Sequence, residues 1–191
     1  MKLEGCVQIV SLERYLETSP ACRAGQVRVC CFAMPKSIPA DFPHLLLRSS
    51  GTHGLGVFAT AAIARGTLVI THRGVVRELS VVPDEMRAMQ IGPGLWLCQD
   101  VENDSPDNYL NHSCEPNVGF TQGTLSMHAL RDIAVGEEIL WDYSTSMNEA
   151  GWRVKCYCGA RSCRGEIRSY CDLTQEQQAK LRPMALAYLR G

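Results

Sequence analysis

Asn111-His112-Ser113-Cys114-Glu115-Pro116-Asn117 places two amides, an imidazole, a hydroxyl and a thiol within one short segment. Asn, Ser and Pro are frequent in turns, so a polar surface turn is the simplest interpretation. The same side chains also bind cofactors and metals, because they supply hydrogen-bonding groups and a soft ligand atom. Partners elsewhere in the sequence must decide between these interpretations.

The composition is that of a globular domain rather than of a nucleic-acid or membrane protein. The chain has 191 residues, of which 46% are hydrophobic, with a net charge of -1 and a pI near 6.5. We therefore expect one domain with a full core, no direct contact with nucleic acid and no membrane partner. Glu4 and Gly5 interrupt the place where a signal peptide needs its apolar centre. This predicts an intracellular protein, cytoplasmic or, in a eukaryote, nuclear.

Clustered cysteines near the C-terminus indicate a metal site. The chain has ten cysteines, and in a reducing compartment such clusters favour metal over disulfides. Cys156, Cys158 and Cys163 have the spacing C-x-C-x4-C, which suits a tetrahedral ion such as zinc. Cys171 and Cys114 compete as the fourth ligand, and local spacing does not choose between them. Three free thiols on a loop are the alternative.

Short strands separated by turns fill the middle of the chain and predict a mostly β domain. Strands are expected at residues 45–50, 57–60, 68–76, 95–98, 118–121, 125–130 and 139–143, and one short helix at 83–89. Residues 118–130 form a predicted hairpin around Gln122-Gly123, and residues 100–107 a predicted acidic loop. Residues 1–44 have weaker signals, and their cysteines lack ligand spacing: Cys6, Cys22, Cys30 and Cys31.

A helix is predicted near the C-terminus. Thr174 followed by Gln177 has the pattern of a capping box, and the helix should run to Arg182, where Pro183 interrupts it. Apolar residues recur at helical spacing in this segment and predict a face that packs on the domain: Leu181, Met184, Tyr188 and Leu189.

Two further features are ambiguous when each is taken alone. The segment Gly51-Thr52-His53-Gly54-Leu55-Gly56 allows the backbone to approach a ligand closely, although a β-turn explains it as well. It is not a dinucleotide fingerprint, because Ala59 stands where a third glycine is required and a strand follows. Tyr143 ends an apolar strand, where its hydroxyl could accept a proton, donate a hydrogen bond or lie in the core.

The joint order of four motifs is far more specific than any one of them. The motifs are G-L-G-V-F-A at 54–59, N-H-S-C-E-P-N at 111–117, G-E-E-I-L-W-D-Y at 136–143 and C-Y-C-G-A-R-S-C-R-G at 156–165. Together they resemble the SET-domain protein lysine methyltransferases with a post-SET zinc segment. The resemblance implies a mostly β SET-domain fold, with several short β-sheets and a pseudoknot, at 45–144. It further implies a post-SET zinc segment at 145–168, and leaves an N-terminal extension at 1–44 and a C-terminal helical tail at 169–191.

The resemblance also implies an activity, namely methylation of the lysine ε-amine in a histone or other basic protein with S-adenosyl-L-methionine. Tyr143 is then the catalytic residue, and the channel for the lysine is formed by Trp141, Tyr143 and His72. The cofactor is expected to contact Gly54, Leu55, Gly56, Tyr109, Asn111, His112 and Tyr143. Structural zinc is expected on Cys114, Cys156, Cys158 and Cys163, so the resemblance favours Cys114 over Cys171. The alternative is a catalytically silent SET-like, zinc-stabilised protein-binding module.

The sequence departs from the family pattern at three places. Asn108-Tyr109 stands where the family commonly has Arg-Phe, which affects one cofactor contact. His72 holds the place of a second active-site tyrosine. Trp141 replaces the usual Phe or Tyr two residues before Tyr143, and its bulkier ring is expected to limit the number of methyl groups added.

Overall fold

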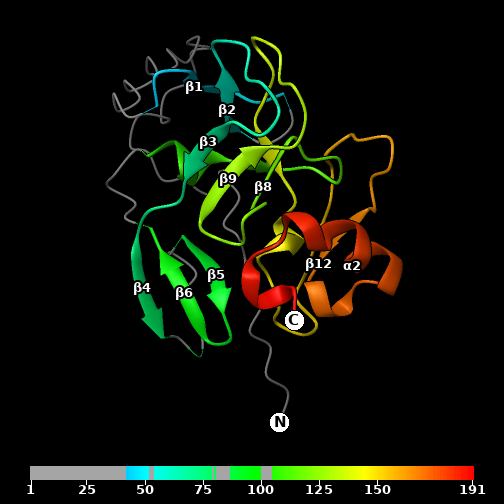
Figure 1. The fold of residues 1–191 in the computed structure, drawn as a ribbon. Helices are drawn as coiled ribbons and strands as arrows, with labels where there is room; N and C mark the ends of the chain where they lie inside the picture. Colours follow the sequence, from blue (N-terminus) through cyan, green and yellow to red (C-terminus); the bar gives the residue numbers. More distant parts are fainter. Residues whose placement is uncertain (1–41, 52–53, 79, 81–86, 100–104) are drawn as a thin grey trace, which may run out of the picture.

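Short strands in small sheets build most of the protein (Figure 1). The computed structural model describes residues 42–51, 54–78, 80, 87–99 and 105–191. The expectations for residues 1–41, including their cysteines, and those for 83–86 and 100–104 lie outside these ranges. Five sheets occur within the described residues, and the mostly β prediction is confirmed.

Three of these sheets are two-stranded pairs. β1 (Leu45–Ser49) pairs with β2 (Leu55–Ala59), and β11 (Arg153–Lys155) with β12 (Glu166–Arg168), both antiparallel. β7 (Asn111–His112) and β10 (Leu140–Trp141) are parallel, although both are very short. This parallel pair aligns two of the sequence motifs side by side.

The other two sheets have three strands each. One has the order β3-β9-β8, with β3 at Leu68–Thr71, β9 at Ser126–Ala129 and β8 at Val118–Gly119. The other has the order β4-β6-β5, with β4 at Val75–Glu78, β6 at Leu95–Cys98 and β5 at Ala88–Gly92. The hairpin predicted at 118–130 is confirmed by the antiparallel pairing of β8 with β9. Gly123 at its turn has a φ of 71°, a conformation that favours glycine.

The prediction of one strand at 68–76 is wrong, because the chain changes sheets at residues 72–74. The His72 backbone N–H donates to the Leu125 carbonyl (3.0 Å), and that of Arg73 to the Asp107 carboxylate (3.1 Å). Gly74 permits the crossing, since a Cβ there would lie 2.5 Å from the Cys98 carbonyl oxygen. These long-range contacts separate β3 from β4, although the sequence pattern at 68–76 predicts a single strand.

The helix predicted at 83–89 is wrong where the structure describes it. Ala88 and Met89 belong to β5 and pair with Cys98 and Leu97 of β6. Met89 is buried in the core, so sheet pairing and burial outweigh the local helical signal.

The main core lies where the sheets meet. Its most deeply buried apolar residues come from several different strands and loops: Val57, Ile70, Val118, Phe120, Met127, Ile133 and Ile139. Phe120 is one of the largest of these side chains and contacts the ring of Trp141 edge to face, with ring centroids 5.5 Å apart. The core therefore extends directly to the β10 motif.

The C-terminal segment packs against this body. α2 (Gln175–Leu181) has the predicted capping box, with the Thr174 hydroxyl and the Gln177 side chain each accepting from the other's backbone N–H. The 3₁₀ turns η5 (Arg182–Met184) and η6 (Ala187–Leu189) follow, and the predicted apolar face packs with Tyr170. The backbone N–H of Leu186 donates to the Thr145 carbonyl (3.0 Å), two residues beyond Tyr143. Of the helices in the described ranges, none is long and apolar enough to cross a membrane.

Candidate functional site

The turn at 111–117 is mostly buried and is hydrogen-bonded to β10. Ser113 and Asn117 donate from their backbone N–H groups to the carbonyls of Trp141 (2.9 Å) and Leu140 (3.0 Å). The Asn117 side chain also donates to the Glu138 carbonyl (2.7 Å) and accepts from the Leu140 N–H (2.8 Å). A surface turn is therefore the wrong interpretation, because most of the polar groups of the segment face inward.

His112 connects this turn to Tyr143. The backbone N–H of Tyr143 donates to His112 Nδ1 (3.2 Å), and the Cys114 Sγ lies 3.4 Å from His112 Nε2. Because Nδ1 accepts, the neutral ring carries its proton on Nε2 and donates it toward sulfur. His112 thus orients the start of the Tyr143 segment and a thiol at the same time.

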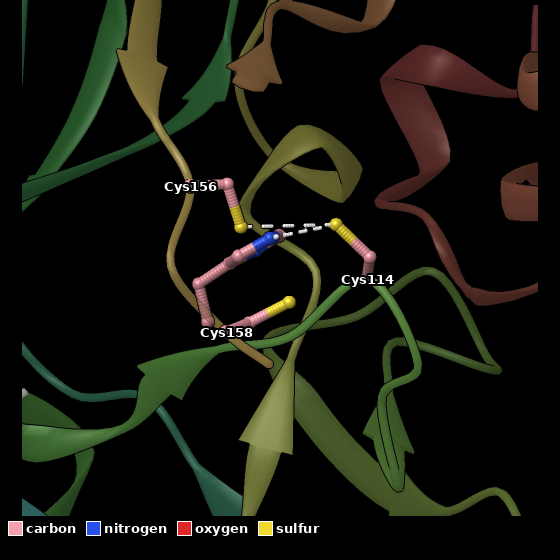
Figure 2. A group of neighbouring side chains, drawn as sticks. Cys114, Cys156 and Cys158 are labelled. Atoms are coloured by element: carbon pink, nitrogen blue, oxygen red, sulfur yellow. Dashed lines mark hydrogen bonds between the residues drawn. The ribbon is translucent and has the colours of Figure 1, made fainter. Parts of the chain in front are cut away.

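Four side chains that could hold a metal ion meet beside this turn. The ligand atoms of His112, Cys114, Cys156 and Cys158 all lie within 4.8 Å of one another, and Figure 2 shows the three thiols around a common centre. Cys163 joins them, with its Sγ 3.7 Å from the Cys156 Sγ. Cys171 is exposed and contacts the Asn148 carbonyl instead.

The spacing of the sulfur atoms suits a tetrahedral ion. Zinc–sulfur bonds of about 2.3 Å in a tetrahedron place the sulfur atoms roughly 3.8 Å apart. The separation is 3.9 Å between Cys114 and Cys156 and 3.7 Å between Cys156 and Cys163. Burial raises the pKa of the Cys114 thiol to about 11 and also raises that of Cys156. Although burial opposes the shift, hydrogen bonds from neighbouring backbone and thiol groups lower the pKa of Cys158 to about 7, so further thiolates at Cys114 and Cys156 beside it would need a cation to coexist.

A buried ion pair joins the strand end to the thiol loop. Asp142 is fully buried, and both its carboxylate oxygens accept from the Arg164 guanidinium (2.6 and 2.8 Å). The backbone N–H of Arg164 also points at the Cys114 Sγ (3.4 Å). Sequence reasoning missed this pair, although Asp142 and Arg164 each lie within a recognised motif, at 136–143 and 156–165.

The three side chains predicted to line the channel lie together. The rings of Trp141 and Tyr143 have centroids 4.9 Å apart, and those of Trp141 and His72 are 5.9 Å apart. The Tyr143 hydroxyl donates to the Leu110 carbonyl (2.9 Å). Burial, together with the Glu138 carboxylate, raises the pKa of Tyr143 well above its usual value. The hydroxyl is consequently a hydrogen-bond donor at neutral pH rather than a base.

The predicted cofactor residues are joined by Glu138, which sequence reasoning missed. The Asn111 side-chain NH₂ donates to the Leu55 carbonyl (3.0 Å) and to Glu138 Oε1 (2.8 Å), and the Ser50 hydroxyl donates to Oε2 (3.0 Å). A Cβ at Gly56 would overlap the Glu138 carboxylate, so the glycine is needed for this packing. The sequence feature that could have indicated Glu138 is its place as the second glutamate of G-E-E at 136–138, directly before the predicted strand at 139–143.

The other predicted cofactor positions frame the same region. Gly54 has a φ of 74°, in the conformation that favours glycine, at the start of β2. Tyr109 ends the 3₁₀ turn η2 (Pro106–Tyr109). The Arg87 guanidinium lies 5.0 Å from the centre of its ring. A positive charge therefore lies near Tyr109, although Asn108 takes the place of the arginine that commonly precedes this position in the family.

Solved structures define the fold class. KRYPTONITE in complex with mCHG DNA and SAH aligns with a TM-score of 0.53 and 24% identity, over 64% of this chain and 28% of that one. A second KRYPTONITE complex, with mCHH DNA, an H3(1-15) peptide and SAH, aligns with a TM-score of 0.51. At this identity the likeness establishes the fold.

The sequence comparison identifies the domain. Residues 54–144 match the family model of the SET domain, so this part of the chain is a SET domain, as the motif order predicted. Human histone-lysine N-methyltransferase 2B is 33% identical over 132 residues, which is 60% of this chain and 5% of that protein. The H3 lysine-4 specific histone-lysine N-methyltransferase of Cryptococcus neoformans is 31% identical over 133 residues, or 61% of this chain and 9% of that protein. The chain thus spans a small part of the length of these relatives.

Proposed function

We propose that this chain transfers a methyl group from S-adenosyl-L-methionine to the ε-amine of a lysine in a protein substrate. The observation that carries the proposal is the hydrogen bond from the Tyr143 backbone to His112, which fixes a partly buried phenol beside the turn of the SET domain. The alternative of a silent binding module gives no role to this arrangement of a phenol, an imidazole and an aromatic cluster.

The cofactor would lie against the glycine segment and the 111–112 strand. The backbone groups of Gly54, Leu55 and Gly56 would contact the cofactor. Asn111 and His112 of β7 would contact it next to them. Tyr109 and Tyr143 would lie at the edges of the site. S-adenosyl-L-methionine supplies an electrophilic methyl group on a sulfonium. The residues of this chain bind it and hold the acceptor amine in line with that methyl, and such positioning supplies much of the acceleration.

The lysine amine must be neutral in order to attack. Removal from water among the rings of Trp141 and Tyr143, beside a positive sulfonium, lowers the pKa of the lysine. The Tyr143 hydroxyl is bound to the Leu110 carbonyl through its own proton, so its oxygen lone pairs are free to accept an N–H of the amine. It therefore orients the lone pair of the amine toward the methyl group.

The thiol cluster would hold a structural zinc ion. Cys114, Cys156, Cys158 and Cys163 provide four sulfur ligands, whereas His112 keeps its Nε2 proton and donates to one of them. Arg164 adds an N–H to the Cys114 sulfur and an ion pair to Asp142. The ion would thereby fix the segment after the SET domain against the Tyr143 strand.

The substrate we propose is the N-terminal tail of histone H3, and the location is the nucleus. Two comparisons support this choice: the fungal relative carries the name H3 lysine-4 specific, and KRYPTONITE was solved with an H3(1-15) peptide. Those properties belong to the relatives, and here they guide the choice of substrate.

The test is methyl transfer from labelled cofactor to H3(1-15) peptide, core histones and a cell lysate. The wild-type chain should label a protein lysine, and Tyr143→Phe should lower the rate by roughly a hundredfold, as loss of one positioned transition-state contact does. Equal labelling by the variant would refute the role of the hydroxyl. Failure to bind the cofactor at millimolar concentration in calorimetry would favour the silent binding module.

A further inference from the structure

The charges of the chain are divided unevenly along its length. Residues 145–191 contain eight Lys and Arg but four Asp and Glu, a net charge of +4, so residues 1–144 carry −5. The net charge of −1 for the whole chain, on which the expectation of no contact with nucleic acid rests, conceals this division. A near-neutral chain can therefore still carry a local basic surface.

The antiparallel pair of β11 and β12 has one inward face and one exposed face. Val154 and Ile167 are opposite each other in the two strands, and Ile167 is buried with the thiol cluster. Because side chains alternate along a strand, the neighbouring residues point to the other side. Three of these are exposed cations and form the basic face of the sheet: Arg153, Lys155 and Arg168.

The charges of the basic face do not stabilise the sheet by themselves. Arg153 lies directly opposite Arg168 in the strand register, and like charges in opposite positions are destabilising. Glu166 pairs with Arg168 (2.8 Å), but neither Arg153 nor Lys155 forms an ion pair with any residue that the structure describes. An anion bound across the two strands would relieve the repulsion.

Tyr157 extends this surface beyond the end of β11. Its side chain is 61% exposed, and the Lys155 ammonium lies 5.0 Å from the centre of its ring. Cys156 and Cys158, on either side of Tyr157, belong to the thiol cluster, which fixes the backbone at this point. The phenol hydroxyl can donate a hydrogen bond to an oxyanion that binds beside Lys155.

We propose that the basic face, together with Tyr157, binds the phosphate backbone of duplex DNA without reading its base sequence. Arginine, lysine and tyrosine side chains are among the groups that commonly contact phosphate in protein–DNA complexes. Binding would raise the local concentration of a substrate protein that is itself bound to DNA. The inference goes beyond the proposed methyltransferase function and does not rest on it.

Duplex DNA fits this surface better than other polyanions do. It carries one charge per about 1.7 Å of helix axis, and the counterions released from it favour binding even by a few exposed cations. Sites for single strands stack bases on aromatic side chains, whereas this surface exposes one ring, which already has Lys155 beside it. An acidic peptide carries its charges on flexible side chains, so it releases fewer counterions.

The dependence of binding on salt tests the proposal with the full chain and a fluorescently labelled DNA duplex. Three phosphate contacts predict that affinity falls about fortyfold between roughly 50 and 200 mM salt, as measured by anisotropy. In Arg153→Gln with Lys155→Gln one contact remains, so the fall should be about three- to fourfold. No binding by the wild-type chain, or the same salt dependence in both proteins, overturns the proposal.

The matched control is Arg65→Gln with Arg77→Gln, which makes the same change in net charge. Both residues are exposed and lie outside the basic face, and Arg77 belongs to β4, on the opposite side of the ribbon from β12 (Figure 1). This control should keep the wild-type salt dependence. An equal loss in both double variants would show that only net charge matters, which contradicts a defined surface.

Single variants separate binding from folding. Arg153→Gln removes the repulsion with Arg168, so its Tm should equal or exceed that of the wild-type chain while it binds DNA more weakly. Tyr157→Phe should weaken binding by about two- to fivefold with an unchanged salt dependence, because the hydroxyl carries no charge. A lower Tm together with weaker binding in Arg153→Gln would indicate a structural role and contradict the proposal.

Competition identifies the partner. Unlabelled duplex should displace the labelled duplex better than single-stranded DNA or polyglutamate does at the same concentration of negative charge. Equal displacement by either competitor would show a single-strand site or a general polyanion site, and the assignment to duplex DNA would fail. These measurements need neither cofactor nor peptide, so their failure leaves the proposed methyltransferase function in place, and a failure of methyl transfer leaves this proposal in place.

Discussion

Replacing His72 by Phe should remove a specific part of the pH dependence of stability. In the unfolded chain this imidazole has a pKa near 6.5, and burial lowers it to about 4 in the folded protein. The folded state therefore binds fewer protons between these values. The contribution of His72 to stability is fully present above pH 6.5 and is lost as the pH falls from 6.5 to 4.

The size of the effect follows from the two pKa values. At pH 5 the unfolded imidazole is almost fully protonated and the folded one is almost fully neutral. This difference makes the free energy of unfolding about 2 kcal/mol smaller than at pH 7. His72→Phe retains an aromatic ring in the site but has no imidazole there to titrate. Between pH 7 and pH 5 its free energy of unfolding should therefore fall by about 2 kcal/mol less than that of the wild-type chain.

Urea denaturation of both proteins at pH 5, 6 and 7 measures the difference directly. Other groups that titrate in this range, including metal ligands, contribute equally to the two proteins and cancel in the comparison. An identical pH dependence for wild type and variant would show that His72 is charged or solvated in the folded protein, and would refute the reasoning.

Two further predictions concern the neighbours of Tyr143. Arg164→Met leaves the buried carboxylate of Asp142 without its partner and should destabilise the protein by about 3–5 kcal/mol, with the added change Asp142→Asn recovering much of the loss in urea denaturation; additive losses would contradict a coupled pair. Trp141→Phe enlarges the space beside Tyr143 and should shift the product toward trimethyl-lysine in intact-mass spectrometry. Trimethyl-lysine as the main product of the wild-type chain would refute the limit that we assign to Trp141.

Much of the fold was predictable because its signals are local. Short alternating strands, the turn at Gly123 and the capping box at Thr174 depend on residues close in sequence, and the structure confirms them. The break at 72–74 was not predictable in this way. It depends on contacts of Arg73 with Asp107 and of Gly74 with Cys98, which lie more than twenty residues away.

The candidate site likewise contains residues that sequence motifs predict and residues whose roles depend on distant partners. The motif order placed the cofactor, channel and thiol residues in one region, and the structure brings Trp141, Tyr143 and His72 together. It did not reveal Glu138, Asp107 or Arg164, because a single acidic or basic residue has no meaning until its distant partner is known. The roles of the cofactor and zinc residues stay predictions.

The acidic loop shows how burial changes the meaning of a charge. The sequence stretch 100–107 resembles a solvated loop, yet Asp107 at its end is 5% exposed and accepts hydrogen bonds from the Arg73 backbone and the Gln99 side chain. It therefore orders the chain next to His72.

The central claim is that the 111–117 turn joins a cofactor site to a metal site, and Cys114→Ser tests it most directly. Zinc content by mass spectrometry and S-adenosyl-L-methionine affinity by calorimetry should be measured on the same preparation, with the exposed Cys171→Ser as the matched control. We expect Cys114→Ser to lose the zinc and to bind the cofactor at least about tenfold more weakly, as disruption of a metal site's supporting contacts typically does, while Cys171→Ser changes neither. Full zinc content in Cys114→Ser, or loss of zinc with unchanged cofactor affinity, would contradict the account.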